Sequence, residues 1–138
     1  MDKPKNWLSI VGIGDDGLDG LGVNAKRVIE TADLVIGGKR HLSFLSSGDQ
    51  KHLQWPTPWN TMLQDLNAAK QAGEKVVVLA SGDPFWFGAG SLVAKHFDQN
   101  EWSSVPHPSS FQFAAHRLGW PLQACKTISL HGYLFSFF

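Results

Sequence analysis

The residues of this chain best suited to bind a small molecule follow an apolar run near its middle. Residues 76–80 read Val-Val-Val-Leu-Ala, and the run stops abruptly at Ser81-Gly82-Asp83-Pro84. An uninterrupted run rich in β-branched residues predicts a buried strand, and Gly-Asp-Pro predicts a turn. In open α/β sheets, ligands bind beyond the carboxyl ends of the strands. We therefore expect the Asp83 carboxylate to lie where a small, polar or positively charged ligand would be held.

Two neighbouring segments favour a binding site over a turn with a purely structural role. Residues 85–90 read Phe-Trp-Phe-Gly-Ala-Gly. Glycine lets a ligand approach the backbone, and aromatic side chains can line its pocket. Further along, Pro106-His107-Pro108-Ser109-Ser110 places two hydroxyl groups at the start of an expected helix. Such a start most often serves as a helix cap, but its free N–H groups can also bind a carboxylate.

A glycine-rich segment near the N-terminus has the spacing of a dinucleotide-binding motif. Residues 12–17 read Gly-Ile-Gly-Asp-Asp-Gly after an apolar run. In a nicotinamide- or flavin-binding fold, the third glycine opens a helix and the next strand ends in an acidic residue. Here residues 18–22 continue as a glycine-containing loop, and the next apolar run ends in Ile36-Gly37-Gly38. A nicotinamide-dependent oxidoreductase is therefore the weaker alternative.

The remaining composition argues against several classes of protein. The six histidines show neither an i, i+4 pair nor a cysteine partner, so we expect no metal site. Twelve basic and twelve acidic residues give a formal net charge of +0, which gives no support for binding to nucleic acid or to a membrane surface. One cysteine, Cys125, and the lack of a long apolar segment predict a cytoplasmic protein.

Strands and helices are expected to alternate along the chain, a pattern typical of a parallel α/β sheet. The expected N-caps are Asn24, Asn60 and either Ser109 or Ser110, and Gly73 is expected to follow a helix end. Many aromatic residues, six tryptophans and nine phenylalanines, fit either core packing or a site for a large, flat ligand. The last residues, 133–138, are apolar and are expected to be either buried or foreign to this fold. Strands are predicted over residues 7–13, 33–36, 75–80, a segment ending at 105–106, and 127–130, with a weaker candidate at 52–54; helices are predicted over 24–31, 39–45, 60–72, 86–97 and 109–118.

Three groups of segments together resemble the tetrapyrrole (corrin/porphyrin) methylase family. They are residues 11–17 with 37–42, residues 79–88, and residues 108–111 continued through 118–123 to 129–132. Within the family, the chain most resembles the N-terminal domain of the enzymes that methylate precorrin-6Y or precorrin-7 in cobalamin biosynthesis. The resemblance implies a two-domain α/β methyltransferase that binds S-adenosyl-L-methionine between its domains, acts on a corrin precursor, and forms a homodimer.

The resemblance also assigns site residues by motif position. It implies that Gly14, Asp15 and Asp16 face the tetrapyrrole substrate. Asp83 is the candidate catalytic residue, which would place a cation or accept a proton, although an enamine-like carbon requires no strong base. Orientation and exclusion of water can supply most of the acceleration of methyl transfer. The residues expected to border the cofactor are Ser81, Gly82, Asp83, Trp86, Ser109 and Ser110.

The same resemblance divides the chain into two parts. Residues 1–106 correspond to an N-terminal α/β domain, and residues 107–138 to only the beginning of a second α/β domain. Tyr133 stands where the family usually has arginine, so the chain looks truncated. We therefore expect it to bind S-adenosyl-L-methionine more weakly than micromolar and to have impaired turnover. The alternative is a non-catalytic α/β remnant that binds a partner.

Overall fold

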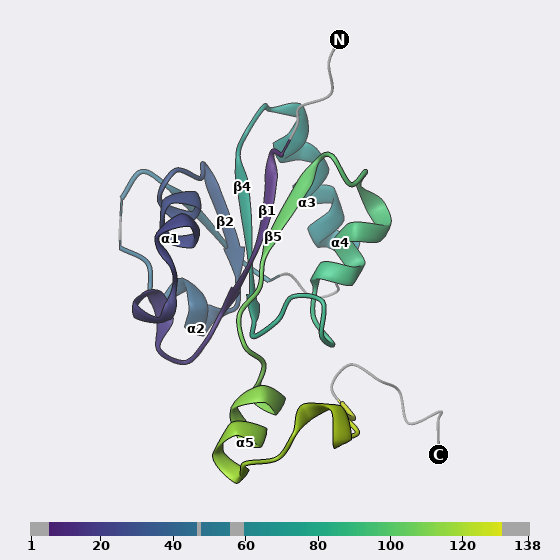
Figure 1. Cartoon of the computed structure of the whole chain (residues 1–138). Coiled ribbons are helices and arrows are strands. Elements are labelled where there is room, and N and C mark those ends of the chain that lie inside the picture. Colours follow the sequence, from purple (N-terminus) through teal and green to yellow (C-terminus); the bar gives the residue numbers. More distant parts are fainter. Residues whose placement is uncertain (1–5, 47, 56–59, 131–138) are drawn as a thin grey trace.

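Continuous apolar runs form the central strands of a five-stranded parallel sheet. The computed structural model describes residues 6–46, 48–55 and 60–130. The strand order is β3-β2-β4-β1-β5, and every pair of neighbours is parallel (Figure 1). The carboxyl ends of the strands therefore share one edge of the sheet. The parallel α/β fold expected from the sequence is confirmed. The strands are β1 (Leu8–Ile13), β2 (Leu34–Gly37), β3 (Lys51–Gln54), β4 (Val76–Ser81) and β5 (Trp102–Val105).

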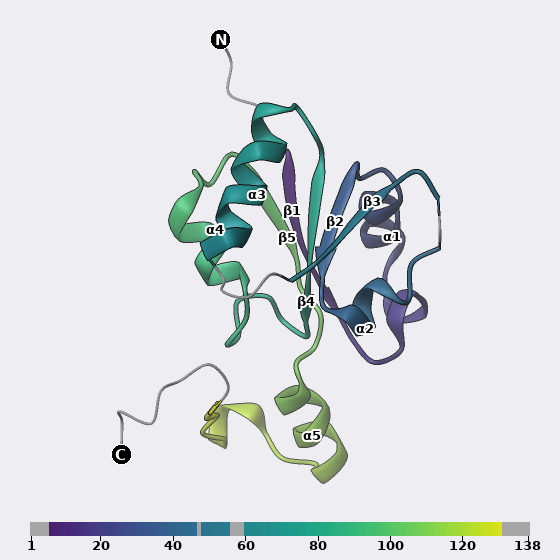
Figure 2. The same ribbon diagram turned by 180° about the vertical axis from the view of Figure 1, so that it is seen from behind.

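Helices cover both faces of this sheet. Figures 1 and 2 show α1 against one face and α3 and α4 against the other. The short helix α2 lies after β2, near the carboxyl edge of the sheet. No helix among the described residues is long and apolar enough to cross a membrane. The helices are α1 (Val23–Glu30), α2 (Lys39–Leu42), α3 (Asn60–Gln71), α4 (Gly90–His96) and α5 (Ser110–Leu118), with 3-10 turns η1 (Gly17–Gly20) and η2 (Leu122–Ala124).

Two hydrophobic cores, one on each face, explain why β4 is apolar from Val76 to Ala80. Val76 and Val78 belong to the core that packs against α3 and α4. Val77 and Leu79 belong to the core that packs against α1. A strand buried on both faces cannot alternate between apolar and polar residues. Full burial of one such side chain contributes about 1.5–3 kcal/mol, so β4 and its neighbours fix the position of the site loops.

Residues 107–130 lie outside both cores. Helix α5 is placed beyond the carboxyl edge of the sheet (Figure 1). The described members of the two cores all come from residues 7–105. Several large apolar side chains after this point are more than half exposed, namely Phe113, Leu118, Trp120, Ile128 and Leu130.

Several predicted element ends are wrong for local reasons. Gly22, not Asn24, is the N-cap of α1, and Asn60 is the first residue of α3. Helix α4 begins at Gly90 instead of Trp86, because a turn closed by the hydrogen bond from the Trp86 N–H to the Asp83 carbonyl oxygen leads into a wider loop, closed by the bond from the Gly90 N–H to the Pro84 carbonyl oxygen. Residues 127–130 form no strand, since no neighbouring strand is there to pair with them. The expectation for residues 133–138 lies outside the described residues.

Candidate functional site

The carboxyl ends of β1 and β4 meet the start of α5 at closely packed glycines. A Cβ atom on Gly12 would lie 2.2 Å from the carbonyl oxygen of Gly82. The N–H of Gly82 donates to the carbonyl oxygen of Ile13, at 3.0 Å. Gly82 has a φ of +63°, and its added Cβ would be 3.1 Å from the Cα of Ser109. Two segments predicted to border the cofactor are therefore in contact, and only glycine fits between them.

His107 fills the space between these loops. Its Nε2 atom would lie 2.4 Å from a Cβ on Gly14, and its ring lies 6.0 Å from that of Phe113. Nε2 is buried and has no hydrogen-bond partner in the described structure. His107 therefore packs the first glycine loop against the segment after β5, a role that sequence reasoning missed.

Asp83 shapes the turn after β4. Its Oδ1 accepts a hydrogen bond from the N–H of Phe85 at 2.8 Å, and its carbonyl oxygen accepts one from the N–H of Trp86 at 3.1 Å. Such a side-chain bond to the backbone two residues on is typical of an Asx turn. The carboxylate predicted to meet a ligand thus has one oxygen committed to the turn.

The aromatic run after Asp83 is held in an unusual backbone conformation. Phe87 has a φ of +53°, which is rare for a residue other than glycine. A Cβ on Gly88 would lie 2.5 Å from the carbonyl oxygen of Pro84, so the turn is tightly wound. Residues held in such conformations cluster at functional sites. The side chains of Trp86 and Phe87 approach Phe111 of α5, with ring centroids 6.3 and 6.0 Å apart.

The two predicted serines have different surroundings. Ser109 is buried and is the N-cap of α5, where its Oγ accepts a hydrogen bond from the N–H of Gln112. The Gln112 side chain accepts one in return from the N–H of Ser109, at 2.6 Å. This reciprocal pair is a capping box. Ser110 is the first residue of the helix and is exposed.

The predicted substrate-facing residues occupy the loop after β1. Gly14 contacts His107, as described above. Asp15 is exposed, and its Oδ1 lies 2.8 Å from Nη2 of Arg40, so the loop is linked to α2. The carboxylate of Asp16 lies against Gly20 of its own loop, where an added Cβ would be 2.2 Å from Oδ1. Asp15, and not Asp16, therefore points toward α2, which follows β2.

An open pocket of about 670 Å³ lies near the carboxyl ends of β2 and β4. Of the residues predicted to border the cofactor, Ser81 lines it, whereas Gly82, Asp83, Trp86, Ser109 and Ser110 are absent from its wall. The predicted set is therefore divided between this pocket and the packed junction near Ser109. The walls are mainly apolar and aromatic, with two polar side chains; they comprise Gly38, His41, Trp55, Leu79, Ala80, Ser81, Phe87, Gly88, Ala89 and Leu92.

His41 is the second site residue that sequence reasoning missed. Its side chain is 7% exposed, and its Nε2 lies 3.3 Å from Oγ of Ser81. Its Nδ1 is buried without a hydrogen-bond partner in the described residues. Burial lowers the pKa of His41, and the nearby Arg40 guanidinium lowers it further, against an opposing effect of Asp15. The neutral imidazole is therefore the form that prevails near pH 7. The sequence did hold one signal for His41: it comes shortly after Gly37 and Gly38, at the carboxyl end of β2.

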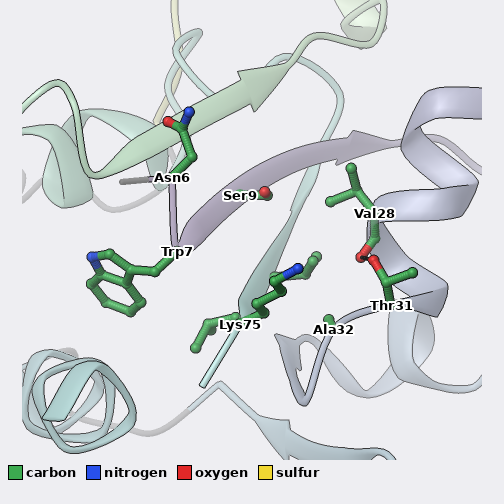
Figure 3. A pocket seen from close by; sticks show the side chains of 9 residues that line it. Asn6, Trp7, Ser9, Val28, Thr31, Ala32 and Lys75 are labelled. Carbon is green, nitrogen blue, oxygen red and sulfur yellow. Dashed lines mark hydrogen bonds between the residues drawn. The ribbon is translucent and has the colours of Figure 1, made fainter. Parts of the chain in front are cut away.

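A smaller cavity lies at the opposite edge of the sheet. It has a volume of about 150 Å³, and none of the predicted site residues lines it. Figure 3 shows Ser9 of β1 beside this space, with Val28 of α1 and Thr31, the residue that follows α1, across from it. The hydroxyl of Thr31 is already bonded to the carbonyl oxygen of Arg27, at 2.9 Å. No cluster of three metal-ligand side chains occurs within residues 6–46, 48–55 and 60–130. The pocket beside Ser81 is therefore the better candidate site.

Comparison with known proteins identifies the family. The family model described as Tetrapyrrole (Corrin/Porphyrin) Methylases matches residues 8–134. The chain belongs to this family. The resemblance inferred from the glycine, Ser-Gly-Asp-Pro and serine segments is thus confirmed.

Individual tetrapyrrole methylases agree with this assignment. The chain is 44% identical over 128 residues to the decarboxylating precorrin-6Y C(5,15)-methyltransferase of Sinorhizobium sp, covering 91% of this chain and 30% of that protein. It is 30% identical over 130 residues to the cobalt-precorrin-7 C(5)-methyltransferase of Salmonella typhimurium, covering 94% and 64%. A crystal structure of a cobalamin biosynthesis precorrin-6Y methylase from Archaeoglobus fulgidus has the same fold, with a TM-score of 0.74 at 23% identity, covering 92% and 66%.

Proposed function

We propose that this chain takes part in S-adenosyl-L-methionine-dependent C-methylation of a corrin precursor, of the precorrin-6Y or precorrin-7 type, in cobalamin biosynthesis. The observation that carries the proposal is the 44% identity to the Sinorhizobium methyltransferase across 91% of this chain. The chain spans only 30% of that relative's length, so the relative's activity is a proposal for this chain.

The size and lining of the pocket beside Ser81 support this choice of cofactor. The pocket beside Ser81 falls within the range of about 300–1,000 Å³ that is usual for small-molecule sites. Its aromatic walls suit an adenine ring, and its hydroxyl and imidazole groups suit polar atoms. We propose that Ser81 and the turn through Gly82, Asp83 and Trp86 hold the cofactor, with Ser109 and Ser110 on the other side of that turn.

S-adenosyl-L-methionine supplies an electrophilic methyl group on a positively charged sulfur. The role of the chain is then mainly to orient the reactants and to exclude water, which Trp55 and Phe87 can do as apolar walls. The free oxygen of the Asp83 carboxylate is proposed to place a positive charge or to accept a proton. Gly14, Asp15 and Asp16 are proposed to face the tetrapyrrole.

The wider assignments are part of the same proposal. Residues 1–106 are proposed as an N-terminal methylase domain, which agrees with both cores being built from residues 7–105. We further propose a cytoplasmic location, a homodimer, and no nucleic-acid partner. The exposed apolar side chains from Phe113 to Leu130 favour a second candidate, a partner-binding module without turnover.

Titration of the full chain with S-adenosyl-L-methionine, followed by amide NMR signals and by calorimetry, tests the cofactor assignment. We expect saturable binding, weaker than micromolar, with shifts at Ser81, Gly82 and Trp86. Saturation by NADH instead would favour an oxidoreductase. The absence of saturable binding would contradict the proposal and favour the partner-binding module.

Asp83→Asn isolates the charge of Asp83 in the same titration. Asparagine keeps an oxygen that can accept the Phe85 N–H, so the turn is preserved while the negative charge is lost. We expect Asp83→Asn to weaken cofactor binding several-fold, and the exposed control Asp49→Asn to leave it unchanged. Full cofactor binding and turnover by Asp83→Asn and by Asp83→Ala would show that Asp83 has no role in the site.

A further inference from the structure

His41 and Ser81 form a polar pair in the wall of an otherwise mainly apolar pocket. Ser81 ends β4 and is exposed, whereas His41 comes from α2 and is buried. The 3.3 Å separation between Nε2 and Oγ joins the two strand ends that flank the pocket. A buried polar group is costly unless it is hydrogen-bonded, yet Nδ1 of His41 has no partner among the described residues, and neither His41 nor Ser81 belongs to either core. Its place on the pocket wall points to a role toward a ligand.

The position of the imidazole proton follows from its surroundings. Nδ1 is buried without a partner in the described structure, so a proton there would be a buried, unpaired donor. Buried donors without partners are rarer in proteins than under-satisfied acceptors. Nε2 is therefore the protonated nitrogen, and it donates to Oγ of Ser81. With its oxygen accepting from His41, the Ser81 hydroxyl is left to donate its own hydrogen.

We infer that His41 is a positioning residue, which orients the Ser81 hydroxyl as a hydrogen-bond donor to an acceptor atom of bound S-adenosyl-L-methionine. The inference rests on the proposed function. It concerns a residue outside the segments predicted to border the cofactor. Because His41 acts through Ser81, loss of either side chain should remove the same interaction.

Two measurements on the full chain test this role. In the free chain, ¹⁵N NMR of the His41 ring reports which nitrogen carries the proton, and Ser81→Ala should shift the Nε2 signal. In titrations with S-adenosyl-L-methionine, His41→Leu and Ser81→Ala should each raise Kd about tenfold, the effect of about one lost hydrogen bond. His41→Gln keeps an N–H donor of similar reach and should stay within about threefold of the wild type. The matched control is His96→Leu, since His96 is exposed on α4 and bonded to its own helix.

The double variant separates positioning from packing. If His41 acts through Ser81, the His41→Leu/Ser81→Ala chain should bind no more weakly than Ser81→Ala alone. Additive losses, equal losses for His41→Gln and His41→Leu, or a proton on Nδ1 would overturn the inference. If His41→Leu does not fold, the Ser81→Ala and His41→Gln titrations and the ring signals decide the question. Failure of the wild type to bind the cofactor would instead refute the proposed function.

Discussion

Gly12 sets how closely β1 can approach the turn after β4. Any larger residue there would place its Cβ 2.2 Å from the Gly82 carbonyl oxygen and 2.9 Å from His107. Both neighbours include backbone atoms, which cannot move away without breaking the hydrogen bond that the Gly82 N–H donates to the Ile13 carbonyl oxygen. We expect Gly12→Ala to lower the free energy of unfolding by about 2–3 kcal/mol, as overpacking does in cores. Urea denaturation followed by tryptophan fluorescence measures this.

Gly48 supplies the control for this substitution. An added Cβ at Gly48 meets no atom within 4 Å, so Gly48→Ala should change stability by no more than about 0.5 kcal/mol. Equal stability of the Gly12→Ala and Gly48→Ala chains would show that the loops at Gly82 and His107 can separate freely.

Helix α5 contributes no residue to either core, so its own ends matter for its stability. It begins with the capping box of Ser109 and Gln112 and ends at Gly119, which has a φ of +67°. Ser109→Ala should therefore destabilise the helix by about 1 kcal/mol, whereas Ser109→Asp retains a capping oxygen and should cost less. Hydrogen exchange at the amides of Gln112 and Phe113 measures the local effect.

Ser110→Ala is the control for the capping role of Ser109 in the same helix. Ser110 is exposed and is not the cap, so its loss should leave exchange rates nearly unchanged. Faster exchange in Ser110→Ala than in Ser109→Ala would contradict the assignment of the cap.

An element could be predicted from the sequence when its own residues determine it, and could not when it depends on distant parts of the fold. Burial on both faces made β4 apolar from Val76 to Ala80 and easy to recognise, whereas the edge strand β3 is largely exposed and gave a weak pattern. Residues 127–130, Thr-Ile-Ser-Leu, were predicted to form a strand, but a strand needs a partner, and the sheet ends at β5. Helix α4 starts late because the turns at Asp83 and Pro84 use backbone bonds that a residue pattern does not reveal.

The site followed the same rule. A parallel sheet brings strand ends together, so the contact between Gly82 and Ser109 was within reach of the sequence. The pairing of His41 with Ser81 was not, because it depends on β2 lying beside β4 and on the direction in which α2 leaves the sheet.

At the scale of the whole molecule, Glu101 connects α3, the loop before β5 and the residue before β1, at the end of the sheet opposite the candidate site. Its carboxylate pairs with the Lys70 ammonium on α3 and accepts hydrogen bonds from the N–H of Asp98, at 2.9 Å, and from Nε1 of Trp7, at 3.4 Å. Burial acts to raise the pKa of Glu101, but the bonds from Lys70, Asp98 and Trp7 outweigh it and lower the pKa below its usual value of 4.5. The folded chain therefore holds this carboxylate ionised more strongly than the unfolded chain does.

This difference predicts how stability depends on pH. A lowered pKa in the folded state stabilises the fold at pH values above 4.5, and this contribution is lost as the pH falls through the folded-state pKa. Glu101→Gln removes the charge, so near pH 7 it should lower the free energy of unfolding by about 2 kcal/mol, the value of hydrogen bonds to a charged group. The difference in the free energy of unfolding between the wild type and Glu101→Gln should then become smaller as the pH falls below 4.5. Urea denaturation at a series of pH values measures this difference.

The control is Glu30→Gln, since Glu30 is exposed on α1. Its free energy of unfolding should differ from that of the wild type by the same small amount at every pH. If the difference for Glu101→Gln also stayed constant from neutral to acid pH, ionisation of Glu101 would not stabilise the fold.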